Sequence, residues 1–262
     1  SFSLMAIAVL YFGFGVFHII LASLFSSIIT AFLYYMYSRI FLKIKLNYKS
    51  REANINMRSI AIFSLITLVM TASQRSDIIF LSFSSTSYEV GLYAIPYAII
   101  LKLNMVRNTL AIGFSPATVK EIDKGTLPSR NYFLYSLFLL ITTGICASIV
   151  SYLSESILSL FGQDFSSASE ILKLLIFSIP LIFATVPFTL FLQSTSNEIF
   201  ILLSVLLALL LKIPLYFFLY DLYGVLGVVY SSLAFNIISL ILLFLSTYLL
   251  ILKGNNKLDK LT

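Results

Sequence analysis

The stretch that decides the fold runs from residue 75 to residue 116 and reads RSDIIFLSFSSTSYEVGLYAIPYAIILKLNMVRNTLAIGFSP. It joins two apolar segments, each long enough to cross a bilayer, which takes about 20 apolar residues of helix. Charged side chains interrupt both segments. A Lys or Arg at the centre of a membrane helix costs roughly 2.5–3.5 kcal/mol, so it normally faces a bundle interior or a watery cavity. The stretch therefore indicates a path for a polar solute and not a reaction centre.

The composition of the whole chain is typical of a membrane protein. Of its 262 residues, 60% are hydrophobic and 11% are charged, and the mean hydropathy is +1.01, whereas soluble domains have about 45–50% apolar residues. No Gly- or Pro-rich linker interrupts the chain, so we expect one all-α membrane domain with short loops. The single cysteine, Cys146, excludes an internal disulfide and is expected in the core. Because the chain begins at Ser1 without an initiator Met, we expect a fragment of a longer protein.

Seven segments are expected to cross the membrane as complete helices, since each is apolar and bounded by polar or turn-forming residues. These spans are 15–38, 59–82, 90–113, 132–153, 170–192, 198–220 and 224–252. Residues 15–37 and 224–246 share seven identities, which indicates a repeat of six helices related by an axis along the membrane normal, or chance likeness between two Leu- and Ile-rich helices.

The domain organisation follows from these spans and from the basic residues. We expect 1–58 to be the end of a first transmembrane lobe and a linker, 59–252 a second lobe of six helices, and 253–262 a tail. Alternate loops place twelve Lys and Arg residues on one side of the membrane and none on the other. Because basic residues stay on the cytoplasmic side, linker and tail are expected there, at the cell membrane. This placement accounts for the net charge of +6 without a nucleic-acid partner.

Four cations and one acid lie inside the expected spans, namely Arg75, Lys102, Arg107, Lys212 and Asp77. Lys102 lies nearly at the centre of its span, where snorkelling to the surface is hardest. Arg75 and Asp77 point to opposite faces of one helix and cannot pair with each other. The excess of cations favours an anionic substrate such as a phosphate. The alternative is that the cations pair with helix C-terminal carbonyls or with acids outside this chain.

Polar side chains accompany the cations at helical spacing on two neighbouring spans. The first stripe is Ser64, Thr67, Thr71 and Gln74, and the second is Tyr93, Tyr97, Asn104 and Asn108. Such stripes line a hydrated cavity or make hydrogen bonds between helices; we interpret them as a cavity because cations accompany them. Tyr97 and Asn104 join the four cations as predicted substrate-cavity residues, and Asp77 is a candidate to bind a coupling proton or cation.

Hydrolytic and metal-dependent chemistry are not expected. His18 is the only histidine, which argues against a Ser-His-Asp triad and a His-rich metal site. The GxxxxGK[ST] pattern of ATP-hydrolysing proteins is absent from the sequence. We therefore expect neither an enzyme nor a protein that needs a cofactor.

Several short motifs occur in a suggestive order. Asp77-Ile-Ile-Phe-Leu precedes Val90-Gly91-Leu92-Tyr93, Ser115-Pro116, Leu160-Phe161-Gly162-Gln163-Asp164-Phe165 and Gly224-Val225-Leu226-Gly227. In this order they resemble the second half of polysaccharide and O-antigen flippases of the Wzx type, in the multidrug/oligosaccharidyl-lipid/polysaccharide exporter superfamily. The resemblance covers roughly residues 15–252.

The resemblance implies two six-helix bundles that rock about a central cavity and flip a lipid-linked anionic oligosaccharide across the membrane by alternating access. Its partners would be that glycan, membrane lipids, and a coupling cation or proton. Replacing Lys102 with Ala is then expected to abolish polysaccharide export. Two alternatives stay open: a multidrug antiporter of the same superfamily, which would favour acids in the cavity, and a non-transporting scaffold for envelope synthesis, whose cations pair internally.

Overall fold

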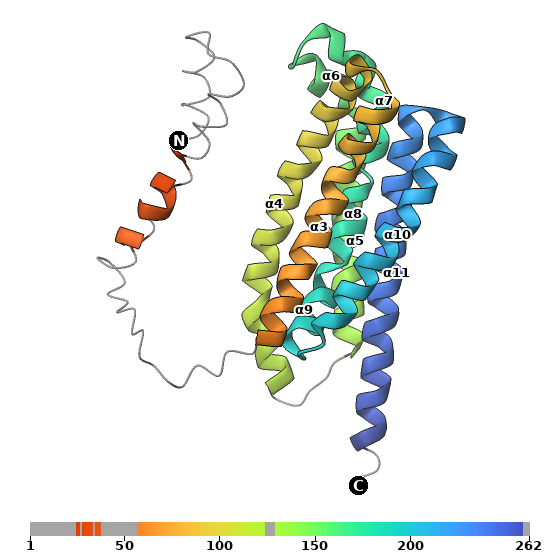
Figure 1. Cartoon of the computed structure of the whole chain (residues 1–262). Helices are drawn as coiled ribbons and strands as arrows, with labels where there is room; N and C mark the ends of the chain where they lie inside the picture. The colour runs from red at the N-terminus through yellow and green to blue at the C-terminus, as the bar shows by residue number, and fades with distance from the viewer. Residues whose placement is uncertain (1–24, 27, 34, 38–56, 124–128, 259–262) are drawn as a thin grey trace. The chain divides into compact units, whose positions relative to one another are not determined.

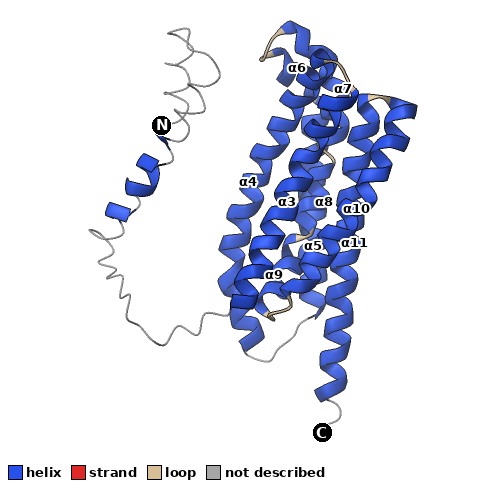
Figure 2. Cartoon of the chain, viewed as in Figure 1, coloured by secondary structure: helices blue, strands red, loops and turns tan. Residues whose placement is uncertain are grey.

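A computed structural model describes residues 25–26, 28–33, 35–37, 57–123 and 129–258. Within these residues every regular element is a helix, and short loops join the helices (Figure 2). The chain divides into two compact units, Ser1–Ile55 and Asn56–Thr262. In the first unit the described residues are helical; the second contains all the elements discussed below. The expectation of an all-α fold is confirmed.

The second unit is a bundle whose long helices run alternately up and down (Figure 1). Its elements are α3 (Met57–Ser84), α4 (Ser87–Asp123), α5 (Ser129–Tyr152), α6 (Ser154–Ser159), the 3₁₀ helix η1 (Gln163–Ala168), α7 (Ser169–Leu175), α8 (Ser178–Ala184), α9 (Val186–Ser194), α10 (Glu198–Tyr223) and α11 (Val225–Leu258).

Six helical segments of the described chain are long and apolar enough to cross a membrane. They are Met57–Ser84, Ser87–Ser115, Tyr132–Tyr152, Phe165–Ser194, Glu198–Tyr223 and Val225–Leu252. Six of the seven expected spans are thus found, with ends that differ by a few residues; much of the remaining one, 15–38, lies outside the described residues. The unit is a multi-pass membrane bundle by length and composition.

The fourth of these segments, Phe165–Ser194, forms the centre of the bundle. In its most apolar part 78% of the residues are buried, against 11–33% in the other five segments, and its helices pack against α4, α5, α10 and α11. The sequence predicts one helix over 170–192, but the structure divides this span into α7, α8 and α9, and η1 precedes them. Pro180 and Pro187 contribute to the division because neither has a backbone N–H to continue the helical hydrogen bonds.

Tight turns join the outer helices. Between α3 and α4 the backbone N–H of Thr86 donates to Glu89 Oε2 at 3.0 Å, and the Glu89 N–H donates to Thr86 Oγ1 at 3.3 Å; this reciprocal pair is a capping box that starts α4. Between α10 and α11, Gly224 has φ +58°, a value that favours glycine.

The core consists of two hydrophobic clusters. One includes Leu81, Leu172 and Val228, and the other includes Phe188 and Leu243. Cys146, which the sequence analysis places in the core, is instead exposed on α5, because the outward face of a membrane helix is as apolar as the bundle interior.

Candidate functional site

A buried ion pair joins α3 to α10. Lys212 Nζ lies 2.8 Å from Asp77 Oδ1, and both side chains are 3% exposed. The ammonium group also donates to the carbonyl oxygen of Ser73 at 3.3 Å and to Ser76 Oγ at 3.4 Å. It lies 5.1 Å from the centroid of the Phe235 ring, within range of a cation–π interaction.

Three hydroxyl groups complete the surroundings of the Asp77 carboxylate. Tyr93 Oη donates to Oδ2 at 2.8 Å, Ser232 Oγ lies 2.8 Å from both carboxylate oxygens, and Tyr216 Oη donates to Oδ1. The donors come from α4, α11 and α10, so the Asp77 carboxylate ties four helices together. A charge in a membrane interior is tolerated only with such partners.

The ion pair corrects one expectation. The sequence analysis counts Lys212 among cations without an acidic partner, in a substrate cavity. Instead Lys212 is paired with Asp77 in the bundle interior, because α10 packs against α3. Asp77 cannot pair with Arg75 on its own helix, as expected, and Arg75 is exposed. The interpretation of Lys212 as a substrate-cavity residue therefore loses its basis.

We expect Tyr93→Phe to lower the free energy of unfolding by about 1.5–3 kcal/mol, because it removes a hydrogen bond to a charged group while keeping the buried ring. Tyr88→Phe is the matched control, since Tyr88 is 65% exposed; it should change stability by less than about 0.5 kcal/mol. Denaturant unfolding of the purified protein in detergent measures both. Equal effects of the two variants would contradict the role assigned to Tyr93.

A polar cavity of about 110 Å³ opens among α3, α4, α9, α10 and α11. Its polar lining residues are Ser73, Gln74, Asn104, Arg107, Asn108, Thr185, Thr189, Asn236 and Ser239. Among the described residues that line it, Arg107 is the only charged one. Gln74 on α3 and Asn108 on α4 are exposed, so the cavity reaches the surface of the bundle between these two helices.

Arg107 projects into this cavity with few partners. Its Nη2 donates to Thr185 Oγ1 at 3.3 Å, and its Nη1 lies 3.5 Å from Asn108 Oδ1. Three lining atoms are buried without a hydrogen-bond partner: Arg107 Nε, Asn104 Oδ1 and Ser239 Oγ. In the described part of the chain the one ion pair is Lys212–Asp77, so no carboxylate there neutralises Arg107. The structure thus brings together two of the predicted residues, Arg107 and Asn104.

The first polar stripe faces away from the bundle core. Its members and Arg75 are all exposed on α3. Ser64, Thr71 and Arg75 lie on the side opposite the buried Ser73 and Asp77, whereas Gln74 lies between the two sides and also lines the polar cavity. Thr67 and Thr71 donate to carbonyl oxygens one turn earlier, at 2.9 and 2.8 Å, so lipid would tolerate them. The structure shows no comparable side-chain hydrogen bond to the backbone for Arg75 or Gln74. Their side chains therefore favour contact with water over contact with lipid.

The second stripe faces inward at Tyr93, Tyr97 and Asn104 and reaches the surface at Asn108. It meets the first stripe at one point. Tyr97 is buried and donates from its hydroxyl to the backbone oxygen of Gln74; its ring stacks on that of Tyr93, with centroids 5.6 Å apart. Lys102 is exposed and lies five residues beyond Tyr97, which turns it about 140° away from this stripe. The structure therefore does not bring Lys102 together with Arg107.

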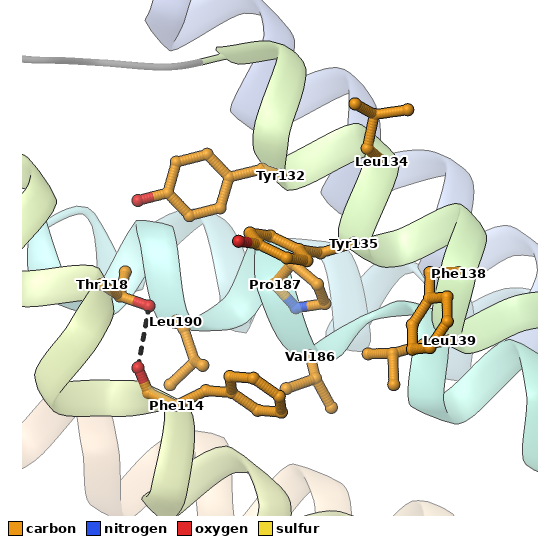
Figure 3. Close-up of a pocket in the computed structure, with 10 residues that line it drawn as sticks. All are labelled: Phe114, Thr118, Tyr132, Leu134, Tyr135, Phe138, Leu139, Val186, Pro187 and Leu190. Atoms are coloured by element: carbon orange, nitrogen blue, oxygen red, sulfur yellow. Dashed lines mark hydrogen bonds between the residues drawn. The ribbon is translucent and has the colours of Figure 1, made fainter.

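A larger apolar pocket lies on the other face of α9. Figure 3 shows its residues, which come from α4, α5 and α9 and enclose about 590 Å³. Val186, Pro187 and Leu190 line this pocket, while Thr185 and Thr189 line the polar cavity. An apolar pocket and a polar cavity therefore adjoin one central helix.

Several residues of the site were missed in the sequence analysis: Tyr216, Ser232, Asn236, Ser239 and Thr185. Of these, Ser232, Asn236 and Ser239 follow helical spacing within an apolar segment, and that signal could have indicated a polar face on α11. Asn236 Nδ2 donates to the backbone oxygen of Ser232 at 2.9 Å, which links the polar cavity to the ion pair along α11.

The described fold and site define a class of protein: a multi-pass, all-α membrane bundle with polar groups in its interior. No protein-family model, no curated protein and no solved structure matches this chain.

Proposed function

We propose that this chain is part of a transporter that flips a lipid-linked anionic oligosaccharide across the cell membrane by alternating access, with its C-terminus in the cytoplasm. One observation carries the proposal: Arg107 lies in a polar cavity without an acidic partner in the described chain, and that cavity opens beside the exposed Arg75 stripe. A phosphate-bearing head group offers the negative charge that these guanidinium groups lack. Lys102, on another face of α4, would act from outside the cavity.

The distribution of polar and apolar surface supports an amphiphilic substrate. The exposed stripe on α3 would form one wall of a hydrated path, and a second lobe would supply the opposite wall. The apolar pocket beside α9 offers room for part of a lipid chain. In this proposal the path is complete only when the second lobe is present.

A multidrug antiporter, the first alternative, is less well supported. Such a protein would use free carboxylates to attract cationic drugs, whereas Asp77 is already bound by Lys212 and three hydroxyls. If Asp77 takes a coupling cation, that cation has to replace the ammonium group of Lys212. The second alternative, a non-transporting scaffold, is expected to have cations that pair internally. Lys212 fits that expectation because it is paired with Asp77, whereas Arg107 has no acidic partner in the described chain.

We expect Arg107→Gln and Arg75→Gln each to lower the rate of flipping about tenfold or more, since a hydrogen bond to a charged group contributes about 1.5–3 kcal/mol. The assay uses the full-length protein in proteoliposomes with a fluorescent polyprenyl-diphosphate-linked oligosaccharide. Lys173→Gln is the control because it removes the same charge from an exposed residue of α7. Unchanged flipping in both arginine variants, at equal protein levels, would refute the proposal.

A further inference from the structure

The polar cavity at Arg107 has the size of a small binding site. Its volume of about 110 Å³ is well below the roughly 300–1,000 Å³ of pockets for drug-sized ligands, yet larger than a single water requires. It therefore suits a group of a few heavy atoms. A sugar with its full set of hydroxyls needs a larger pocket.

The cavity walls present unused hydrogen-bonding groups. Arg107 Nε and Ser239 Oγ are buried donors without a partner, and the amide of Asn104 has a buried unpartnered oxygen. Each such group left unsatisfied costs about 1–3 kcal/mol. Rotation of the Asn104 amide by 180° would present its NH₂ group instead, so all three residues can donate toward the same space.

The charge of Arg107 separates an anion from water as the occupant. Water can satisfy the three polar groups, but it leaves the guanidinium charge uncompensated among low-dielectric surroundings such as Met70, Val205 and Leu243. Asp77, four residues from the lining residue Ser73 on α3, is already paired with Lys212. A tetrahedral oxyanion supplies both the charge and several acceptor oxygens, and a guanidinium binds it with two parallel hydrogen bonds.

We propose that this cavity binds one phosphate-sized oxyanion, held by Arg107 with Asn104 and Ser239 as additional donors. The inference deepens the proposed function, and it rests on that function only for the natural ligand, which would be the phosphate of a lipid head group. Free inorganic phosphate has the same chemistry. In either case the sugar portion stays outside the cavity, toward Gln74 and Asn108.

Thermal unfolding of the purified full-length protein in detergent tests this site. At constant ionic strength set with chloride, a hundredfold excess of inorganic phosphate over its Kd should raise Tm by about 5–10 °C. Arg107→Gln should weaken phosphate binding at least tenfold. Ser239→Ala, which breaks no hydrogen bond within the described chain, should weaken it about threefold to tenfold without lowering the Tm of the unliganded protein. Lys173→Gln, which removes a charge from an exposed residue of α7 outside the cavity, should bind like the unmodified protein.

A second arm distinguishes the source of the phosphate. Micelles that contain phosphatidic acid are compared with micelles that contain phosphatidylcholine. A shift that depends on Arg107 with phosphatidic acid alone identifies a lipid head group, and a shift with inorganic phosphate identifies a free-anion site; both support the proposal. No Arg107-dependent shift with either compound overturns it in favour of a water-filled cavity. Phosphate binding without flipping would leave this site standing while the transport proposal fails.

Discussion

Gly227→Ala is expected to abolish recovery of folded protein. A Cβ atom built on Gly227 would lie 2.1 Å from the backbone oxygen of Leu219 and 2.7 Å from the backbone nitrogen of Tyr220. Those atoms belong to the backbone of α10, so the clash cannot be relieved by rotating a side chain. The helices α10 and α11 would have to separate. This pair makes an extensive helix–helix contact in the bundle. We expect a loss of more than about 4 kcal/mol, which few single substitutions cause.

The matched control is Gly144→Ala in α5. Its Cβ would meet no atom within 4 Å, and alanine in a helix interior is favoured over glycine by up to about 1 kcal/mol. The control variant should therefore be at least as stable as the unmodified protein. Size-exclusion chromatography of a fluorescent fusion in detergent measures both. A monodisperse Gly227→Ala protein with a Tm close to that of the control would show that the helices do not approach so closely.

The second large effect concerns the Lys212–Asp77 pair. Asp77→Asn leaves a buried ammonium group without an anionic partner, because the new amide, the Ser73 carbonyl oxygen, the Ser76 hydroxyl and the aromatic faces are all neutral, and we expect it to cost about 3–5 kcal/mol. Lys212→Met should cost less, because three hydroxyl groups still donate to the remaining carboxylate. The ranking follows from the number of partners that each surviving charge keeps.

The double variant separates this pair from two independent defects. Asp77→Asn combined with Lys212→Met removes both charges, so its cost should fall short of the sum of the single costs by about 2 kcal/mol. Reversible unfolding in mixed micelles gives all three values, with Lys173→Met as an exposed control. Additivity within about 0.5 kcal/mol would mean that the two side chains do not interact.

The membrane class and most of the span positions could be predicted from the sequence because hydropathy is a local property of the chain. A run of about 20 apolar residues predicts a span wherever its helix packs. Helical spacing also places Lys102 about 140° from Tyr97, on a different face of the helix, although the sequence analysis grouped both as substrate-cavity residues. That spacing, however, does not say which of the two faces is buried.

The partners of the charged residues required the tertiary structure. Asp77 and Lys212 are far apart in the sequence and meet only because α3 packs against α10. For the same reason, the sequence analysis grouped Lys212 with Arg107, although one is paired and the other is not.

The sequence by itself determined that this is a membrane bundle with charges inside its spans, since composition and periodicity are written along the chain. Only the tertiary structure decided which charges neutralise each other and which of them face a cavity. The physical reason is that electrostatic pairing depends on distances of a few ångströms between helices, and those distances arise from the packing of the whole bundle.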